Sequence, residues 1–276
     1  MDKHSSLLKK ILHNKSIVIG GVILLIFIFL SIFAPLLAPH DPAETNSSMN
    51  FSPPTKEYPF GTDDYGRCIL SRMVWGGRVS LLYSFLALLL AMAIGIPLGL
   101  LAGYYKYLDN VLMRIVDVLM AFPGTLLAIA IVGILGPGLA NVTIAVGIGT
   151  MPAYARLIRG SVLSLKSLPF VEASLSAGAK DSRIILHHIL PNCISTIIVY
   201  SMLQMAWVIM SISTLSFLGI GAQSPTPEWG ALVSAGRDYI FSSPHVSSFP
   251  VIFIFLTVTA FNLVGDGLRD TLDPRM

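Results

Sequence analysis

Charged side chains are scarce in this chain. Asp, Glu, Lys and Arg make up 12% of its 276 residues, whereas 54% are hydrophobic and the mean hydropathy is +0.75. A soluble domain carries roughly 25% charged residues. The composition therefore excludes an ordinary soluble domain and predicts an integral membrane protein.

Several motifs of enzymes and of nucleic-acid-binding proteins are also missing. There is no G-x-x-x-x-G-K-[ST] phosphate loop, so the chain should not hydrolyse ATP itself. No H-E-x-x-H motif, no G-x-S-x-G motif and no basic block with interleaved aromatics is found. His187 and His188 are adjacent and would point about 100° apart on a helix, so they do not form a metal site together. We predict no catalytic residue, no metal site, no cofactor and no nucleic-acid partner for this chain.

Long apolar segments are what the sequence does contain. Six of them are near the roughly 20 residues that a membrane-spanning helix needs. They cover residues 17–38, 79–103, 112–136, 139–158, 193–220 and 249–265. The first is too long for the core of a signal peptide, and Ala34 and Ala38 are each followed by proline, which disfavours cleavage. We therefore predict an all-α protein with six transmembrane helices.

The distribution of lysine and arginine sets the orientation of these helices. With the N-terminus inside, 13 of the 18 basic residues fall on the inner side. This predicts that both termini and segment 159–192 are cytoplasmic, and that segments 39–78 and 221–248 are external. The two cysteines, Cys68 and Cys193, then lie on opposite sides of the membrane and should not pair.

Small and charged residues suggest how the helices pack. A stripe of glycines with four-residue spacing predicts a close approach between helices. It consists of Gly95, Gly99 and Gly103. Pro97 and Pro123 predict kinks, which serve either as hinges or as static packing features. Arg114 and Asp117, three residues apart, are expected to pair along one helix face near the cytoplasmic side.

The fifth apolar segment is the most polar of the six. Gln204, Ser211, Ser213 and Thr214 are candidates for lining a water-filled translocation path. The alternative is that these side chains hydrogen-bond to their own helix or to a neighbour.

A polar segment, residues 172–191, separates the fourth and fifth apolar segments. Ser167 can cap a helix that ends at Gly178, whose position suits a left-handed stop. Asp181 or Ser182 can cap a second helix that leads into the fifth segment. The pattern predicts a cytoplasmic helical hairpin that docks a soluble partner, or alternatively an interfacial helix lying on the lipid.

This segment resembles the EAA motif of ABC importer permeases, which reads Glu-Ala-Ala, three residues, Gly, nine residues and Ile-x-Leu-Pro. The matching residues are Glu172, Ala173, Gly178, Leu190 and Pro191. Two positions depart from the motif, because Ser174 replaces the second alanine and His188 stands at the isoleucine position.

Four further segments resemble the dipeptide/oligopeptide/nickel permease family, and in particular its second permease. They are FAPLLAPHDP, FGTDDYGRCILSRMVWGGRVSL, LSFLGIGAQSPTPEWG and FNLVGDGLRDTLDPRM. They occur in order and extend over nearly the whole chain, so the resemblance is specific.

The resemblance implies a type I ABC importer permease fold and a set of partners. Residues 1–75 would hold the first helix and an external loop, 76–265 a five-helix core with coupling helices at 168–191, and 266–276 a cytoplasmic tail. The coupling residues would be Glu172, Ala173, Ser174, Gly178, Leu190 and Pro191. The partners would be a second homologous permease forming a heterodimer, two cytoplasmic ATP-binding subunits and an extracytoplasmic solute-binding protein. Trp75 and Trp229 would anchor the external side at the lipid interface.

The implied function is ATP-driven import through a multi-pass protein of a bacterial or archaeal cytoplasmic membrane, not catalysis. Short peptides, including glutathione, are the expected cargo, with nickel or a metal chelate as the alternative. An ion-coupled secondary carrier is the rival from another class, but the chain lacks an acidic residue near mid-membrane and a clear internal repeat.

Overall fold

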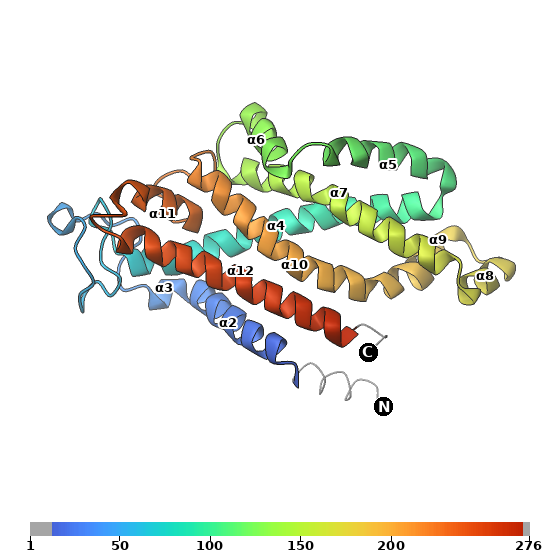
Figure 1. Cartoon of the computed structure of the whole chain (residues 1–276), viewed down its shortest axis with the longest axis horizontal. Helices are drawn as coiled ribbons and strands as arrows, with labels where there is room; N and C mark the ends of the chain where they lie inside the picture. Colours follow the sequence, from blue (N-terminus) through green and yellow to red (C-terminus); the bar gives the residue numbers. More distant parts are fainter. Residues whose placement is uncertain (1–12, 273–276) are drawn as a thin grey trace.

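The computed structural model describes residues 13–272, which form an elongated bundle of helices (Figure 1). The longer helices are α2 (Lys15–Ile32), α4 (Ile69–Tyr104), α5 (Lys106–Met120), α6 (Gly124–Leu135), α7 (Leu139–Lys166), α10 (Leu190–Phe217) and α12 (His245–Leu272). The shorter elements are α3 (Ala34–Leu37), η1 (Ser47–Met49), α8 (Pro169–Ser176), α9 (Asp181–Arg183), the π-helix η2 (Ile184–Ile189), α11 (Trp229–Gly236) and η3 (Arg237–Tyr239).

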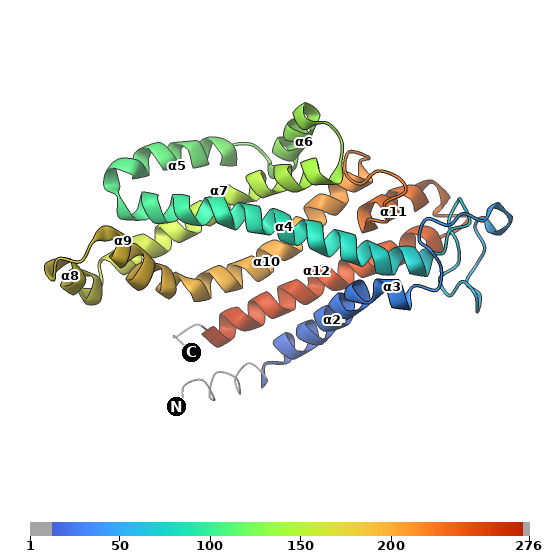
Figure 2. The same cartoon turned by 180° about the vertical axis from the view of Figure 1, so that it is seen from behind.

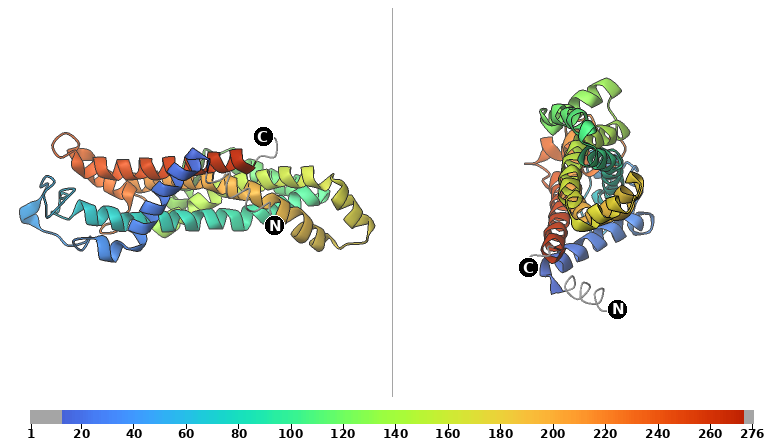
Figure 3. Two further views of the ribbon diagram at one scale, coloured as in Figure 1. Left: turned by 90° about the horizontal axis from the view of Figure 1, so that it is seen from below. Right: turned by 90° about the vertical axis from the view of Figure 1, so that its right-hand side faces the viewer.

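The centre of the bundle is built from α4, α7, α10 and α12. Their facing side chains form the largest apolar core, which includes Ala91, Tyr154, Ile209 and Ala260. Helix α2 packs along α12 on one side of this core, and α5 and α6 lie against α7 on the other (Figures 1 and 3). Many large apolar side chains on the outside remain exposed, as expected for helices that face lipid.

Four helical stretches among the described residues are long and apolar enough to cross a membrane. They are α2, α4, the continuous stretch Asp181–Phe217 and α12. The pair α5 and α6 makes a fifth if it is taken as one bent span. Helix α7, which contains the predicted segment 139–158, is 28 residues long but is not among these four stretches.

The segment predicted as one kinked span over 112–136 is divided between two helices. Helix α5 ends at Met120 and α6 begins at Gly124, and the two are bent by 90°. Pro123 stands before α6 in an extended conformation, with φ −55° and ψ 128°. Proline has no N–H to donate and disfavours the helical conformation of the residue before it. The expected kink at Pro123 is therefore a complete break, whereas α4 continues through Pro97.

The predicted close approach along the glycine stripe is confirmed between α4 and α7. A Cβ added at Gly99 would lie 2.6 Å from the carbonyl oxygen of Ala155, and one at Gly95 would lie 2.6 Å from that of Met151. At Gly103 the added Cβ would lie 2.6 Å from the Cβ of Val162. These glycines let the two backbones touch where a larger residue would separate them.

The two ends of the bundle differ in structure. Helices α8 and α9 project from one end, while segment 38–68 and α11 lie at the other (Figures 1 and 2). Cys68 and Cys193 are both buried and unpaired. Some predictions fall outside the described residues, namely the inner positions of Lys3, Lys9, Lys10 and Arg275 and the end of the tail, 273–276.

Candidate functional site

Residues 168–191 form a short helix, a tight turn and a second helical stretch. Helix α8 ends at Ser176, and Gly178 adopts φ +76°, the left-handed conformation expected of a helix stop. The Gly178 N–H donates to the Leu175 carbonyl at 3.0 Å, and the Ala179 N–H donates to that of Ser174 at 3.1 Å. Two main-chain bonds therefore close the turn.

The predicted helix caps of this segment are wrong. Leu168 is the N-cap of α8, and the Ser167 hydroxyl instead donates to the Ser164 carbonyl at 3.0 Å. The second stretch starts after Lys180, and no side chain caps it. As predicted, this stretch leads into the fifth span, because α9, η2 and α10 run on without interruption from Asp181 to Phe217. Pro191 lies inside this continuous stretch, directly after the π-helix η2 and at the start of α10.

The residues of the EAA-like motif mostly lie on the surface of this segment. Glu172, Ala173, Gly178 and Pro191 are exposed, and Ser174 and Leu190 are half-buried. Apolar side chains accompany them, since Phe170, Leu175 and Leu186 are 39%, 45% and 54% exposed. An exposed face that mixes apolar and polar groups, outside the apolar bundle, is typical of a docking surface.

The opposite face of the segment is firmly packed. Val171, Ile184 and Ile189 are fully buried and pack against Leu100 of α4 and Val162 of α7. The π-helix lies where this packing meets the start of α10. Such wide helical turns often occur at functional sites.

The candidate path residues of α10 hydrogen-bond mainly within their own helix, as the alternative interpretation expected. Ser211 donates to the Trp207 carbonyl at 2.9 Å and Thr214 to the Met210 carbonyl at 2.7 Å. The Gln204 amide donates to the hydroxyl of Tyr200. Ser213 is buried and donates to Glu228 at 3.3 Å.

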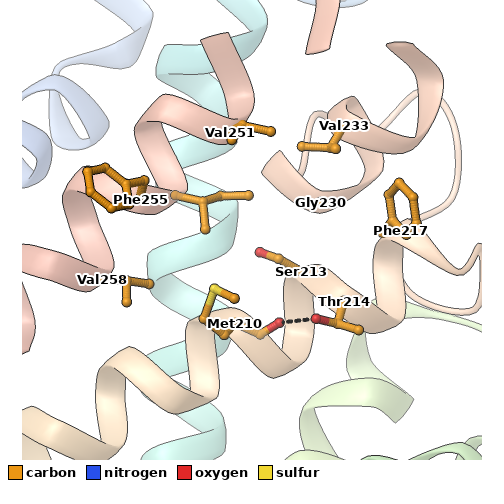
Figure 4. Close-up of a pocket in the computed structure, with 10 residues that line it drawn as sticks. Met210, Ser213, Thr214, Phe217, Gly230, Val233, Val251, Phe255 and Val258 are labelled. Carbon is orange, nitrogen blue, oxygen red and sulfur yellow. Dashed lines mark hydrogen bonds between the residues drawn. The ribbon is translucent and has the colours of Figure 1, made fainter. Parts of the chain in front are cut away.

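A cavity of about 450 Å³ lies between α10, α11 and α12, next to two of these residues (Figure 4). Ser213 and Thr214 line it together with mainly apolar side chains, including Phe217, Val251 and Phe255. The wall of this cavity is mainly apolar, and the hydroxyls of Ser213 and Thr214 are bonded to Glu228 and to the Met210 carbonyl. It lies beside α11, close to the end opposite the hairpin.

The two aspartates of α5 pair with arginines of α7 and not along their own helix. Asp117 accepts from Arg156 at 2.6 Å, so the predicted Arg114–Asp117 pair is wrong. Asp109 accepts two bonds from Arg159, at 2.5 and 2.7 Å. The bend after Met120 lays α5 beside α7 and brings these groups together. Among residues 13–272, no group of three or more His, Cys, Asp or Glu could hold a metal ion.

Glu228 is an important residue that the sequence analysis missed. Its side chain is fully buried between α4, α10 and α11. Its carboxylate accepts from Ser80 at 3.1 Å and from Ser213 at 3.3 Å, and it caps α11 by accepting from the Ala231 N–H at 3.0 Å. A signal existed in the sequence, because Glu228 is the one charged residue between positions 184 and 236.

The neighbouring Trp229 is not an interfacial anchor. It is fully buried, and its indole N–H donates to the carbonyl of Met73 at 3.0 Å. Its ring packs edge-on against Phe27 and Phe253, each 6.0 Å away between centroids. The implied lipid contact is therefore wrong for this residue, and Glu228 and Trp229 together fasten α11 to the core.

Replacing Glu228 by glutamine is expected to flatten the pH dependence of stability. Burial raises the pKa of the Glu228 carboxyl above its usual value. A raised pKa means that the folded protein binds this proton more tightly than the unfolded protein does. The contribution of the protonated carboxyl to stability is therefore complete below the ordinary carboxyl pKa. It is lost as the pH rises through the pKa that the group has in the folded protein. Glutamine stays neutral, and Ser80 and Ser213 can accept from its amide.

The test is the melting temperature of both proteins in detergent between pH 4.5 and 8. As the pH rises, the melting temperature of Glu228→Gln should increase relative to that of the original protein. The control Glu57→Gln, at an exposed position, should show no such relative increase. Parallel curves for Glu228→Gln and the original protein would contradict the assignment.

Comparison with known proteins defines the class to which this fold belongs. The chain is similar to two solved structures of the MetNI methionine ABC transporter in inward-facing conformations, with TM-scores of 0.58 and 0.60. The sequence identities are 20% and 19%, and each match covers 74% of this chain and 96% or 97% of the other. At this identity the likeness establishes the fold, that of an ABC transporter permease.

The sequence comparisons then establish the family. A family model described as "Binding-protein-dependent transport system inner membrane component" matches residues 95–276, and one described as "N-terminal TM domain of oligopeptide transport permease C" matches residues 6–54. The dipeptide transport system permease protein DppC of Alkalihalophilus pseudofirmus is 47% identical over 97% of this chain and 88% of its own. The glutathione transport system permease protein GsiD of Pectobacterium atrosepticum is 46% identical over 97% of this chain and 90% of its own. The chain belongs to the ABC importer permeases of the dipeptide/oligopeptide family, which are multi-pass membrane subunits and not enzymes.

Proposed function

We propose that this protein is a permease subunit of an ATP-driven importer for short peptides, with dipeptides and glutathione as the favoured cargo. The observation that carries the proposal is near full-length identity of 46–47% to permeases named for dipeptide and glutathione transport. These relatives favour peptides over nickel or a metal chelate as the cargo. Membership of an ABC importer family argues against the ion-coupled carrier.

We propose that residues 168–191 are the coupling helices and that Glu172, Ala173, Ser174, Gly178, Leu190 and Pro191 contribute to them. The support is geometric, since one face of the segment is exposed and the other is packed into the bundle. A rigid hairpin of this kind can transmit movement from a docked ATP-binding subunit. Two such subunits, a second homologous permease in a heterodimer and an extracytoplasmic solute-binding protein would complete the importer.

In the membrane, we propose six spans with both termini in the cytoplasm of a bacterium or archaeon. The excess of lysine and arginine on one side supports this orientation. The position of α8 and α9 at the end opposite segment 38–68 and α11 agrees with it. Residues 76–265 would form the core, with the first span outside it.

The translocation path is proposed to include the side of α10 that carries Gln204, Ser211, Ser213 and Thr214. The cavity beside Ser213 and Thr214 supports this placement, although their hydroxyls are bonded within the protein. Its apolar wall suits uncharged parts of a peptide better than a bare metal ion.

Cargo is tested by uptake of a radiolabelled dipeptide into vesicles that contain the complete importer. We expect unlabelled dipeptides or glutathione to compete for uptake and nickel ions not to do so. Saturable nickel uptake with no peptide competition would reject the peptide proposal while leaving the permease class intact.

A further inference from the structure

Three segments meet at Tyr104, at the end of the bundle that carries the hairpin. Tyr104 is the last residue of α4, and its side chain is only 6% exposed. The end of α7 lies on one side of it and α9, the start of the second hairpin stretch, on another. A residue in this position can join the core helices to the hairpin.

The contacts of Tyr104 reach both neighbours. Its hydroxyl donates to the carboxylate of Asp181 on α9 at 2.8 Å. The ammonium of Lys166, the last residue of α7, donates to the Tyr104 carbonyl at 2.6 Å and lies 5.0 Å from the centre of its ring. The ring of Tyr105 packs edge-on against Tyr104, with the centroids 5.0 Å apart. Tyr104 therefore ties the three helices together, through its hydroxyl to α9 and through its carbonyl and ring to α7.

The polar contact adds something that the apolar packing beneath it cannot provide. Ile184 and Ile189 of the hairpin are buried against core side chains such as Ile158. Apolar contacts have no preferred direction, so this packing holds the hairpin against the core without a directional bond that fixes its angle. A hydrogen bond to a charged acceptor is directional and roughly twice as strong as one between neutral groups. It fixes the register in which the hairpin moves with α4.

We propose that Tyr104 is a positioning residue that couples movement of the hairpin to α4 and α7. This inference rests on the proposed function, in which residues 168–191 dock an ATP-binding subunit. When that subunit pulls on the hairpin, the Tyr104–Asp181 bond carries the movement directly to the C-terminal end of α4, and Lys166 links the same point to α7. Without the hydroxyl, part of the movement is lost in the apolar joint.

The variant Tyr104→Phe removes the hydroxyl and keeps the ring. In vesicles with the complete importer, we expect the ATP-binding subunits to remain bound and the number of ATP molecules hydrolysed per peptide imported to rise about tenfold, the scale set by one charged hydrogen bond. The control is Tyr107→Phe, since that side chain is 72% exposed and lies just beyond the same helix end. It should leave the ratio unchanged.

Substitutions of Asp181 distinguish coupling from simple structural support. Asp181→Asn keeps a carbonyl oxygen that can accept from Tyr104, so it should retain most of the coupling. Asp181→Ala removes the acceptor from an exposed residue and should reproduce the effect of Tyr104→Phe. Equal behaviour of the two Asp181 variants would overturn the inference.

Measuring Glu172→Lys in the same preparation distinguishes failure of the Tyr104 inference from failure of the proposed docking role of residues 168–191. If that variant abolishes uptake while Tyr104→Phe keeps a normal ratio, the coupling role of Tyr104 alone is rejected. If Tyr104→Phe releases the ATP-binding subunits, the residue supports docking and the inference is also rejected. Normal uptake with Glu172→Lys would instead reject the docking role of the hairpin itself.

Discussion

Replacing Glu172 by lysine is expected to reduce ATP-driven uptake about 100-fold or more while the protein remains folded in the membrane. Glu172 is exposed in the first turn of α8, on the surface of the proposed coupling helices. Reversing a charge within a docked interface reduces the binding free energy by several kcal/mol. Because about 1.4 kcal/mol changes affinity tenfold, the ATP-binding subunits should no longer dock. The helix itself should survive, because an exposed charge near its N-terminus contributes only about 0.3–1 kcal/mol.

The measurement pairs uptake with recovery of the ATP-binding subunits on affinity-purified permease. The matched control is Asp270→Lys, which reverses the charge of another exposed acid, in the last turn of α12. It should leave both quantities close to those of the original protein. Normal subunit recovery with Glu172→Lys would show that this face does not dock them.

Replacing Gly99 by leucine is expected to prevent α4 and α7 from packing. The first added carbon alone would lie 2.6 Å from the carbonyl oxygen of Ala155 and 2.7 Å from the Cβ of Ile158. Backbone atoms cannot move aside as a flexible side chain can, so the helices must separate. Overpacking costs about 1–3 kcal/mol in typical cores and more when backbones are forced apart.

The expected result is a protein that inserts but elutes as aggregate from a sizing column in mild detergent. Gly160→Leu on α7 is the control, because a Cβ at that position meets no atom within 4 Å. It should elute as the original protein does, with a gain in helix propensity of about 0.5–1 kcal/mol. Similar elution of both variants would contradict the close α4–α7 contact.

Features that depend on local spacing were predictable from the sequence. The four-residue spacing of Gly95, Gly99 and Gly103 places them on one helix face wherever the helix lies, and their close packing follows from their size. The stop at Gly178 is equally local, because the left-handed conformation favours glycine in any context. The approximate positions of the apolar helices follow from segment length in the same way.

Features that depend on tertiary partners were not predictable. Asp117 has Arg114 within reach along its helix, yet it pairs with Arg156 because the bend after Met120 lays α5 against α7. A hydropathy average does not register that bend. Glu228 stands out in the sequence as a lone charge, but its partners and the burial of Trp229 depend on where α11 folds back onto α4 and α10.

The exposed face of the hairpin was only partly predictable. Its motif is visible in the sequence, but which side chains face outward depends on how Ile184 and Ile189 are buried. The difference matters for function, because Glu172, the proposed docking residue, is on the exposed face. Tyr104, the proposed positioning residue, packs in the same cluster as the buried Ile184 and Ile189.

The most direct test of the account is the energy source of transport. The permease, its partner permease, the solute-binding protein and the ATP-binding subunits are reconstituted in vesicles, and peptide uptake is measured with ATP or with an imposed proton or sodium gradient. The account predicts uptake with ATP that disappears when the ATP-binding subunits are omitted, and none with a gradient alone. Gradient-driven uptake by the permeases without those subunits would contradict it.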